Sequence, residues 1–343
     1  MSQPEVIVDQ VVLRDGFVPL IDISSARNGD PRQRQAVADA IGRCCESSGF
    51  LLLVGHGVPD GVIEDVNRAL REFFSLPRAL KEQVGADPAD PLARGFSSAG
   101  NLAATNDGAD PVAEHESPDQ VEKFVYFPQG NPEGFDGPGW ADGRVSIAER
   151  WPEVPGFRAA YARYYDEMAS LATELSRLFA LALGLREDWF DTLIDRHNSN
   201  LMANHYPADD QPAGHIRLSQ HSDWGNLTIL LQDETQNGLQ VRDDRGEWLD
   251  VPVVPGSFVI NIGDLLARWT NDRWVSTVHR VVGTGAPTAE RFSLPFFHQP
   301  NFDAVIECIP TCATVDNPAR YEPVVSGPYL LDKFKVAYDL SPS

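Results

Sequence analysis

The first third of the chain alternates between helical and strand-like hydrophobic patterns. Residues 33–49 carry apolar positions at helical spacing and stop at Gly49, and residues 59–77 repeat this pattern between two prolines. Between them, the run FLLLVGHGV at 50–58 is almost continuously apolar, which predicts a short buried strand. We therefore expect a mixed α/β region at the N-terminus.

The middle of the chain loses this periodicity and then regains it in one long segment. Residues 85–120 are rich in Gly, Pro, Ala and Asp, which predicts a long, lid-like loop. Residues 129–156 are again rich in Gly and Pro. Residues 157–185 then place Leu and aromatic residues at helical spacing, which predicts a long helix bracing the core.

From about residue 200 the pattern becomes that of a β protein. Short apolar runs such as NLTILLQD and STVHRVVGTG are separated by turn residues, and RDDRGEW is typical of a hairpin turn. A jelly roll of about eight strands fits residues 200–310. The fold class we expect is mixed α/β with this jelly-roll core and helices packed outside it.

The charge balance excludes several classes of partner. With 28 Lys and Arg against 50 Asp and Glu, the formal net charge is −22, which disfavours nucleic acids and anionic membrane surfaces. The sequence has no apolar run of about 18 residues and no apolar stretch typical of an export signal near its start, so we expect a cytoplasmic protein. The oligomeric state is not evident from the sequence.

The first candidate for chemistry lies in LSQHSDWGNLTILL, residues 218–231. Positions i and i+2 of a strand point to the same face, so His221 and Asp223 are expected to project together. Such a pair is also common by chance at the exposed end of a strand. The pair alone therefore leaves both interpretations open.

A second histidine makes a metal site the more specific hypothesis. His279 lies in RWVSTVHRV, a strand-like run of the same predicted core, and a double-layered roll can bring it beside His221 and Asp223. Two imidazoles and one carboxylate on one face form the facial triad of non-haem Fe(II) oxygenases. The triad leaves three coordination positions for a bidentate cosubstrate and dioxygen.

Two further pairs at strand spacing suggest a receptor for a carboxylate. Arg291 and Ser293 share a face, and a guanidinium with a hydroxyl can bind the distal end of a dicarboxylate. Asn204 and Tyr206 share a face one predicted strand earlier than the His-x-Asp pair. An exposed strand edge for the first pair, and core packing for Tyr206, are the alternatives.

These motifs together resemble the isopenicillin N synthase-like family of Fe(II)/2-oxoglutarate-dependent oxygenases. The resemblance rests on the order Asn-x-Tyr, His-x-Asp, His-Arg-Val and Arg-x-Ser, and on the N-terminal runs VPLIDIS and CCESSGFLLLVGHGVP. It covers residues 17–330, and only the stretch between His279 and Arg291 is longer than usual.

The resemblance implies a fold and a division of the chain. The catalytic core is a double-stranded β-helix at 200–310. An N-terminal non-haem dioxygenase region spans 1–130 and includes the lid-like loop 85–120. A linker and the long bracing helix occupy 131–199, and a C-terminal segment follows at 311–343.

The resemblance also implies an activity. His221, Asp223 and His279 would bind Fe(II), and Arg291, Ser293, Tyr206 and Asn204 would bind 2-oxoglutarate. With O2, the enzyme would oxidise an unactivated C–H bond of a small organic substrate, in secondary metabolism or catabolism, and release succinate and CO2. The alternatives are an isopenicillin N synthase-like oxidase without 2-oxoglutarate, and a non-catalytic binding protein on the same fold.

The identity of the substrate is not evident from the sequence. Six side chains near the predicted centre are candidate walls of the substrate pocket, although each could equally pack in the core. They are Arg94, Phe96, Tyr126, Trp224, Phe297 and His298.

Overall fold

The computed structural model of the chain describes residues 11–28, 30–87, 90, 92–98, 119–128, 150–235, 237–286 and 289–337. Most of the loop predicted at 85–120 therefore lies outside the described residues. Inside it, a strand was not anticipated: β4 (Gly95–Ser98) pairs with β5 (Glu122–Tyr126). A partner strand more than 20 residues away supplies the hydrogen bonds that the local sequence does not indicate.

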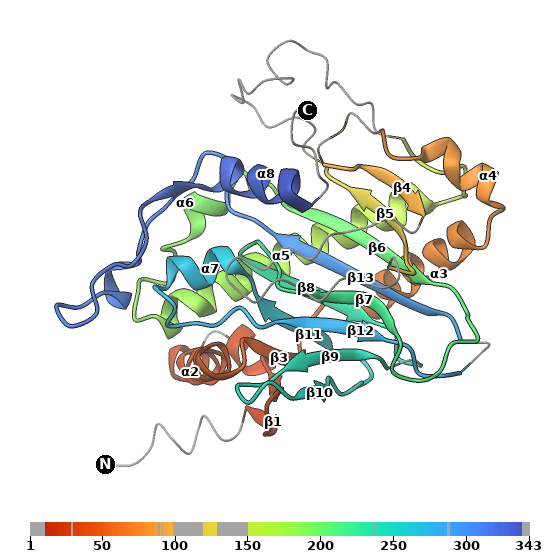
Figure 1. Cartoon of the computed structure of the whole chain (residues 1–343). Coiled ribbons are helices and arrows are strands. Elements are labelled where there is room, and N and C mark those ends of the chain that lie inside the picture. Colours follow the sequence, from red (N-terminus) through yellow and green to blue (C-terminus); the bar gives the residue numbers. More distant parts are fainter. Residues whose placement is uncertain are drawn as a thin grey trace, which may run out of the picture.

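A nine-stranded sheet organises the molecule, in the order β1-β2-β3-β11-β8-β13-β6-β5-β4. The strands of the N-terminal region lie at its two edges, and four strands of the predicted roll form its centre (Figure 1). The N-terminal strands are β1 (Val12–Arg14), β2 (Leu20–Asp22) and β3 (Phe50–Val54). The central strands are β6 (Asn200–Tyr206), β8 (Leu227–Gln232), β11 (Phe258–Ile262) and β13 (Arg291–His298).

A four-stranded sheet, in the order β10-β9-β12-β7, faces this large sheet. Its strands are β7 (Ile216–His221), β9 (Leu239–Arg242), β10 (Trp248–Asp250) and β12 (His279–Val282). Together with the four central strands of the large sheet they make eight strands between 200 and 298, which confirms the predicted jelly roll. The predicted hairpin turn joins β9 to β10, with Asp243 and Glu247 bonded through their backbones at 2.9 Å.

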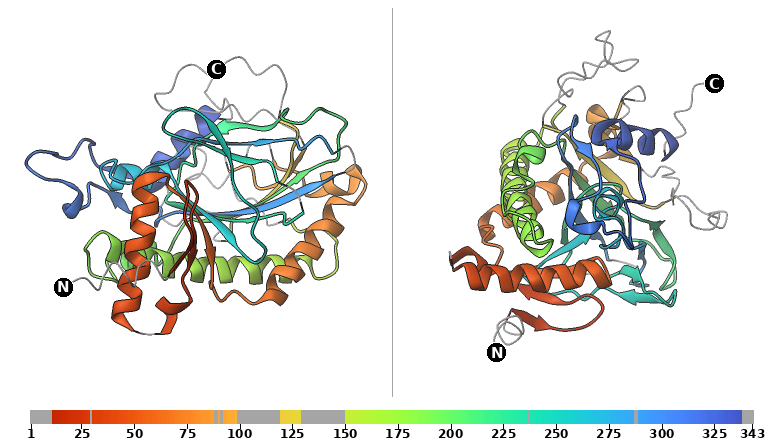
Figure 2. Two further views of the ribbon diagram at one scale, coloured as in Figure 1. Left: turned by 90° about the horizontal axis from the view of Figure 1, so that it is seen from below. Right: turned by 90° about the vertical axis from the view of Figure 1, so that its left-hand side faces the viewer.

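The predicted helices lie on the other face of the large sheet. They are α2 (Pro31–Ser47), α3 (Asp60–Phe74) and α5 (Phe157–Ala182), and Figure 2 shows α5 running along the sheet. Short helices lie between these elements: α4 (Arg78–Lys81) follows α3, α6 (Asp191–Ile194) follows α5, and α7 (Asp264–Trp269) connects β11 to β12. The C-terminal part forms β14 (Val305–Ile306), β15 (Val324–Val325) and α8 (Ser326–Ala337), and α8 lies on the side opposite α5.

The large sheet therefore separates two apolar layers, because successive side chains of a strand point to opposite faces. Leu201, Ala203 and Phe292 point toward the helices and pack with residues of α2, α3 and α5. Tyr206 and Leu230 point toward the small sheet. The site described below lies in this second layer, between the two sheets.

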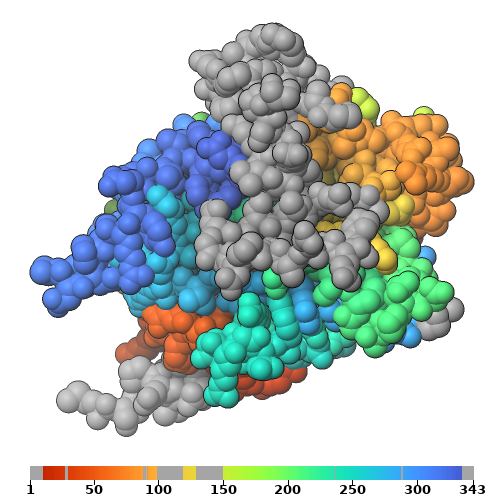
Figure 3. Space-filling view, viewed as in Figure 1, coloured from red at the N-terminus to blue at the C-terminus, as the bar shows by residue number. Residues whose placement is uncertain are grey.

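Two further observations concern membrane-spanning helices and the arrangement of the surface. Within the residues that the structure describes, no helix is both long and apolar enough to cross a membrane. In the space-filling view, the C-terminal segment and the region of α4, β4 and β5 lie on opposite sides of the face shown (Figure 3).

Candidate metal centre and cosubstrate site

The three predicted metal ligands meet between the sheets. His221 ends β7 and His279 begins β12, and the two residues are directly paired across the strands. Their Nε2 atoms lie 3.9 Å and 3.7 Å from the same oxygen, Oδ1 of Asp223. One ligand atom from each residue falls within 4.8 Å of the others. Among the described residues, no other three His, Cys, Asp or Glu side chains converge in this way.

Hydrogen bonds at the Nδ1 atoms of both histidines orient their Nε2 atoms toward the Asp223 carboxylate. Nδ1 of His221 lies 2.8 Å from the Ser219 carbonyl oxygen, and Nδ1 of His279 lies 3.1 Å from that of Thr277. A carbonyl oxygen is only an acceptor, so each Nδ1 carries the proton and each Nε2 offers its lone pair. Burial, with the nearby His279, lowers the pKa of His221 to about 4, which keeps this ring neutral at pH 7.

The Asp223 carboxylate is fixed through its other oxygen. Oδ2 accepts hydrogen bonds from Thr228 Oγ1 at 2.5 Å and from Asn261 Nδ2 at 2.7 Å, and Oδ1 remains directed at the imidazoles. Burial opposes ionisation of Asp223. The two histidines and these two hydrogen bonds nevertheless hold its pKa below the ordinary value. Two imidazoles with a carboxylate form a donor set suited to Fe(II).

The backbone after Asp223 is held by a close approach of two glycines. A Cβ at Gly263 would lie 2.2 Å from the carbonyl oxygen of Gly225, so that position requires glycine. The contact lets the Asp264 amide donate to the Asp223 carbonyl at 2.7 Å. The start of α7 thereby fixes the loop that carries the carboxylate.

The predicted carboxylate receptor is assembled on two adjacent strands. Arg291 pairs with Tyr206 and Ser293 with Asn204 across β13 and β6. The Arg291 guanidinium carbon lies 5.0 Å from the centre of the Tyr206 ring. Tyr206 lines the same cavity as Ser293, and burial raises the pKa of its phenol, so the hydroxyl stays protonated.

Arg291 provides the clearest sign of a missing anionic partner. Its Nε and Nη1 atoms are buried, and neither has a hydrogen-bond partner among the described residues. A buried guanidinium without a partner carries a large desolvation cost. A carboxylate seated between Arg291 and Ser293 would satisfy both nitrogens, so these residues fit the distal end of 2-oxoglutarate.

One cavity of about 170 Å³ joins the three metal-ligand candidates to this receptor. Of the six candidate substrate contacts, the structure brings Trp224 and Phe297 to its wall. Asn200, Met202, Leu218, Gln299 and Leu330 also line it, and none of them was anticipated from the sequence.

The structure does not bring the other four candidates to this cavity. Arg94 is held by Asp90, with Nε 2.7 Å from Oδ2. Phe96 and Tyr126 point to the helix side of the sheet, where Phe96 packs against Phe73 and Tyr126 against Trp151. His298 is fully buried beside Ser199, 3.0 Å from its hydroxyl, and burial lowers its pKa to about 3.

Two charged residues of the cavity, Asp119 and Lys123, were also missed. The sequence contains only a weak indication of their role. Lys123 is one of only four lysines, and it lies within the largely apolar run VEKFVYF. Its neighbours Glu122 and Phe124 face the helices instead. The alternation along β5 therefore places Lys123 on the cavity side.

Comparison with known proteins identifies the family. A model of the 2OG-Fe(II) oxygenase superfamily matches residues 197–300, and a model of the non-haem dioxygenase N-terminal region, named for morphine synthesis, matches residues 18–153. The chain is 30% identical over 333 residues to a 2-oxoglutarate-Fe(II) type oxidoreductase of Emericella nidulans, covering 93% of this chain and 90% of that protein. It is likewise 30% identical over 326 residues to the validamycin A dioxygenase of Streptomyces hygroscopicus subsp. limoneus, covering 93% and 86%.

Solved structures agree with these relatives. A full-length protein of Neurospora crassa, crystallised in complex with alpha-KG, superposes with a TM-score of 0.79 at 30% identity and covers 93% of this chain and 96% of that one. JOX2, solved with 2OG, Fe and JA, superposes with a TM-score of 0.73 at 26% identity and covers 98% and 93%. The chain therefore belongs to the 2OG-Fe(II) oxygenase superfamily and is an Fe(II)- and 2-oxoglutarate-dependent dioxygenase.

Proposed function

We propose that His221, Asp223 and His279 bind the Fe(II), and that the enzyme oxidises an unactivated C–H bond of a small organic substrate. The observation that carries this proposal is the convergence of three ligand atoms within 4.8 Å in the same cavity as a buried guanidinium without a partner. In a protein that bound neither a metal ion nor an anion, both features would bury polar groups without compensating partners.

Arg291 and Ser293 are proposed to hold the distal carboxylate of 2-oxoglutarate. Tyr206 would donate from its protonated phenol and support the guanidinium, while Asn204 positions Ser293 through a 3.4 Å hydrogen bond from Nδ2 to Oγ. This arrangement would fix one end of the cosubstrate and leave its keto-acid end free to reach the metal ligands.

When bound at these residues, Fe(II) and 2-oxoglutarate would together with O2 supply the oxidant that removes a hydrogen from the substrate, with succinate and CO2 as co-products. The chain's own contribution is orientation and exclusion of water. Trp224 and Phe297 line the cavity and shield it, and Thr228 and Asn261 keep Asp223 pointing inward.

The substrate belongs to the class of small organic molecules. Structures of the Neurospora crassa protein contain thymine or 5-formyluracil, which are small polar rings, and these neighbours are 28% and 30% identical to this chain. The cavity of about 170 Å³ includes the proposed 2-oxoglutarate receptor, which favours a small substrate. The four free thiols, Cys44, Cys45, Cys308 and Cys312, support the expectation of a reducing cytoplasm, which stays a prediction.

An anaerobic difference spectrum tests the residue assignments. Fe(II) is added to the metal-free protein, followed by 2-oxoglutarate, and a saturable visible charge-transfer band is expected. The band should disappear in Arg291→Ala while iron still binds, and neither iron nor the band should be retained in Asp223→Ala. Iron binding by wild type without the band would contradict the cosubstrate site and indicate oxidase chemistry instead.

A further inference from the structure

Lys123 is a buried lysine on the wall of the active-site cavity. It is 7% exposed, and its ammonium group forms no hydrogen bond or ion pair within the described part of the chain. Burial lowers the pKa of Lys123 to about 8, while the charge of Asp119 acts in the opposite direction. A buried ammonium group needs a partner, and the described residues supply none at hydrogen-bond distance.

Asp119 is the second charged group on this wall, and only one of its two carboxylate oxygens has hydrogen-bond partners among the described residues. Its Oδ1 accepts from the Ser219 amide at 3.0 Å and from the Ser219 hydroxyl at 2.8 Å. Its Oδ2 is buried without a hydrogen-bond partner in the described residues. No ion pair joins Asp119 to Lys123 among the described residues, and both line the cavity.

The position of Lys123 separates it from the cosubstrate receptor. Ser293, Asn204 and Lys123 are direct cross-strand partners on β13, β6 and β5. Because adjacent strands lie about 4.8 Å apart, the backbone at Lys123 is about 10 Å from that at Ser293. Because the distal carboxylate is assigned to Arg291 in the proposed function, Lys123 and Asp119 are available to a second molecule in the same cavity.

We propose that Lys123 and Asp119 recognise the polar group of the prime substrate, and that this group carries no net charge and offers an acceptor to Lys123 and a donor to Asp119. This inference rests on the proposed function and adds a substrate class to it. A bare anion would satisfy Lys123 but would be repelled by Asp119, and a bare cation would meet the reverse problem. A cyclic amide edge and an α-amino acid both provide the required chemistry.

The test measures binding to protein loaded anaerobically with Fe(II) and saturating 2-oxoglutarate. Three six-membered-ring probes are titrated by calorimetry: δ-valerolactam as the amide, L-pipecolate as the zwitterion and cyclohexanecarboxylate as the anion. Wild type should bind the lactam or the zwitterion at least about tenfold more tightly than the anion, since a hydrogen bond to a charged group contributes about that factor or more. Whichever of these two probes binds more tightly shows whether the polar group of the substrate is an amide or an amino acid.

Two variants connect this preference to the two side chains. Lys123→Met keeps the length of the side chain and removes its donor, so the favoured probe should bind about ten- to a hundredfold more weakly. Asp119→Asn should weaken it as well. Arg245→Met, which removes a positive charge from the exposed β9–β10 turn, should change nothing.

Three results would overturn the inference: tightest binding of the anion by wild type, unchanged binding of the favoured probe by Lys123→Met, or no binding of any probe. Failure of the proposed function itself is distinguishable. It would be seen before any probe is added, as the absence of the 2-oxoglutarate band in wild type. Both variants should retain that band, which shows that they are folded and loaded.

Discussion

Arg291 and Tyr206 face each other directly across β13 and β6, with the guanidinium carbon 5.0 Å from the ring centre. The ring supports one side of the guanidinium while Nε and Nη1 remain buried without partners among the described residues. This pairing defines a rigid, positively charged receptor before any ligand arrives.

Arg291→Lys should bind 2-oxoglutarate at least about a hundredfold more weakly, because an ammonium group cannot reproduce the planar, two-pronged contact of a guanidinium. The measurement is a titration of the anaerobic visible band. Iron affinity should stay within about twofold of wild type, because Arg291 does not contact the metal ligands. Equal cosubstrate affinities for variant and wild type would show that the distal carboxylate binds elsewhere.

Thr228→Val should weaken Fe(II) binding about ten- to a hundredfold, although Thr228 is not a proposed ligand. The substitution preserves the shape of the side chain and removes the hydroxyl that donates to Asp223 Oδ2. Fe(II) affinity is measured by competition with a chelator of known strength. Thr228→Ser, which keeps the hydroxyl, should restore most of the affinity, whereas a purely steric role for Thr228 predicts no such rescue.

Asp223→Asn should reduce iron-dependent 2-oxoglutarate turnover at least about a thousandfold, since the neutral amide is a poor ligand for Fe(II). The purified variant should also lose bound iron, measured by metal analysis. Asp244→Asn, in the exposed β9–β10 turn, is the matched control and should behave as wild type. Full turnover in Asp223→Asn would exclude the proposed metal centre.

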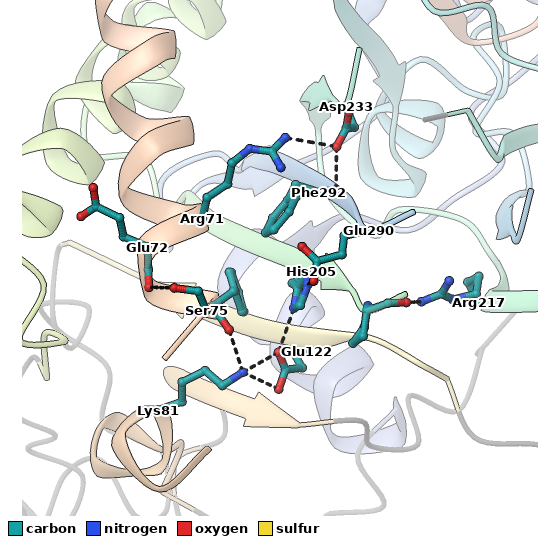
Figure 4. Close-up of polar contacts among 12 residues, drawn as sticks. Arg71, Glu72, Ser75, Lys81, Glu122, His205, Arg217, Asp233, Glu290 and Phe292 are labelled. Atoms are coloured by element: carbon teal, nitrogen blue, oxygen red, sulfur yellow. Dashed lines mark hydrogen bonds and ion pairs between the residues drawn. The ribbon is translucent and has the colours of Figure 1, made fainter. Parts of the chain in front are cut away.

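An ionic cluster of Lys81, Glu122 and His205 links α4 to strands β5 and β6 of the large sheet (Figure 4). Lys81 Nζ lies 2.8 Å from both oxygens of Glu122, and His205 Nδ1 lies 2.9 Å from Oε2 of the same carboxylate. Lys81→Met should lower the free energy of unfolding by about 3 kcal/mol, because it leaves a largely buried carboxylate without its main partner. Urea unfolding at pH 7 measures this, and a loss below about 1 kcal/mol would contradict it.

The same cluster predicts a loss of stability in acid. Burial opposes ionisation of Glu122, but hydrogen bonds from His205 and Lys81 hold its pKa below the ordinary value of 4.5. A depressed folded-state pKa contributes stability that is present above pH 4.5 and is lost as the pH falls through the folded value. Glu122→Gln should therefore flatten the decline in unfolding free energy between pH 5 and pH 3.5, and an unchanged slope would exclude Glu122 as a source.

The sequence by itself determined the parts of the site that follow strand periodicity. The two-residue spacing placed Arg291 beside Ser293 on β13 and Asn204 beside Tyr206 on β6, and the spacing of apolar runs predicted the eight-stranded roll. Asp223 lies beyond the end of β7 at His221, so strand periodicity alone does not account for its position. The same alternation, counted from Arg291, already puts Phe297 on the cavity side and His298 on the opposite face. The sequence pattern therefore contained the reason why His298 does not line the cavity.

Only the tertiary structure decided what long-range pairing brings together. His279 meets His221 because β12 and β7 are neighbours in the small sheet, a contact between residues almost 60 positions apart that periodicity cannot reveal. Lys123 reaches the cavity because β5 joins the large sheet beside β6. Local patterns specify which face a side chain occupies, but the order of the strands, set by packing over the whole chain, specifies which side chains share a cavity.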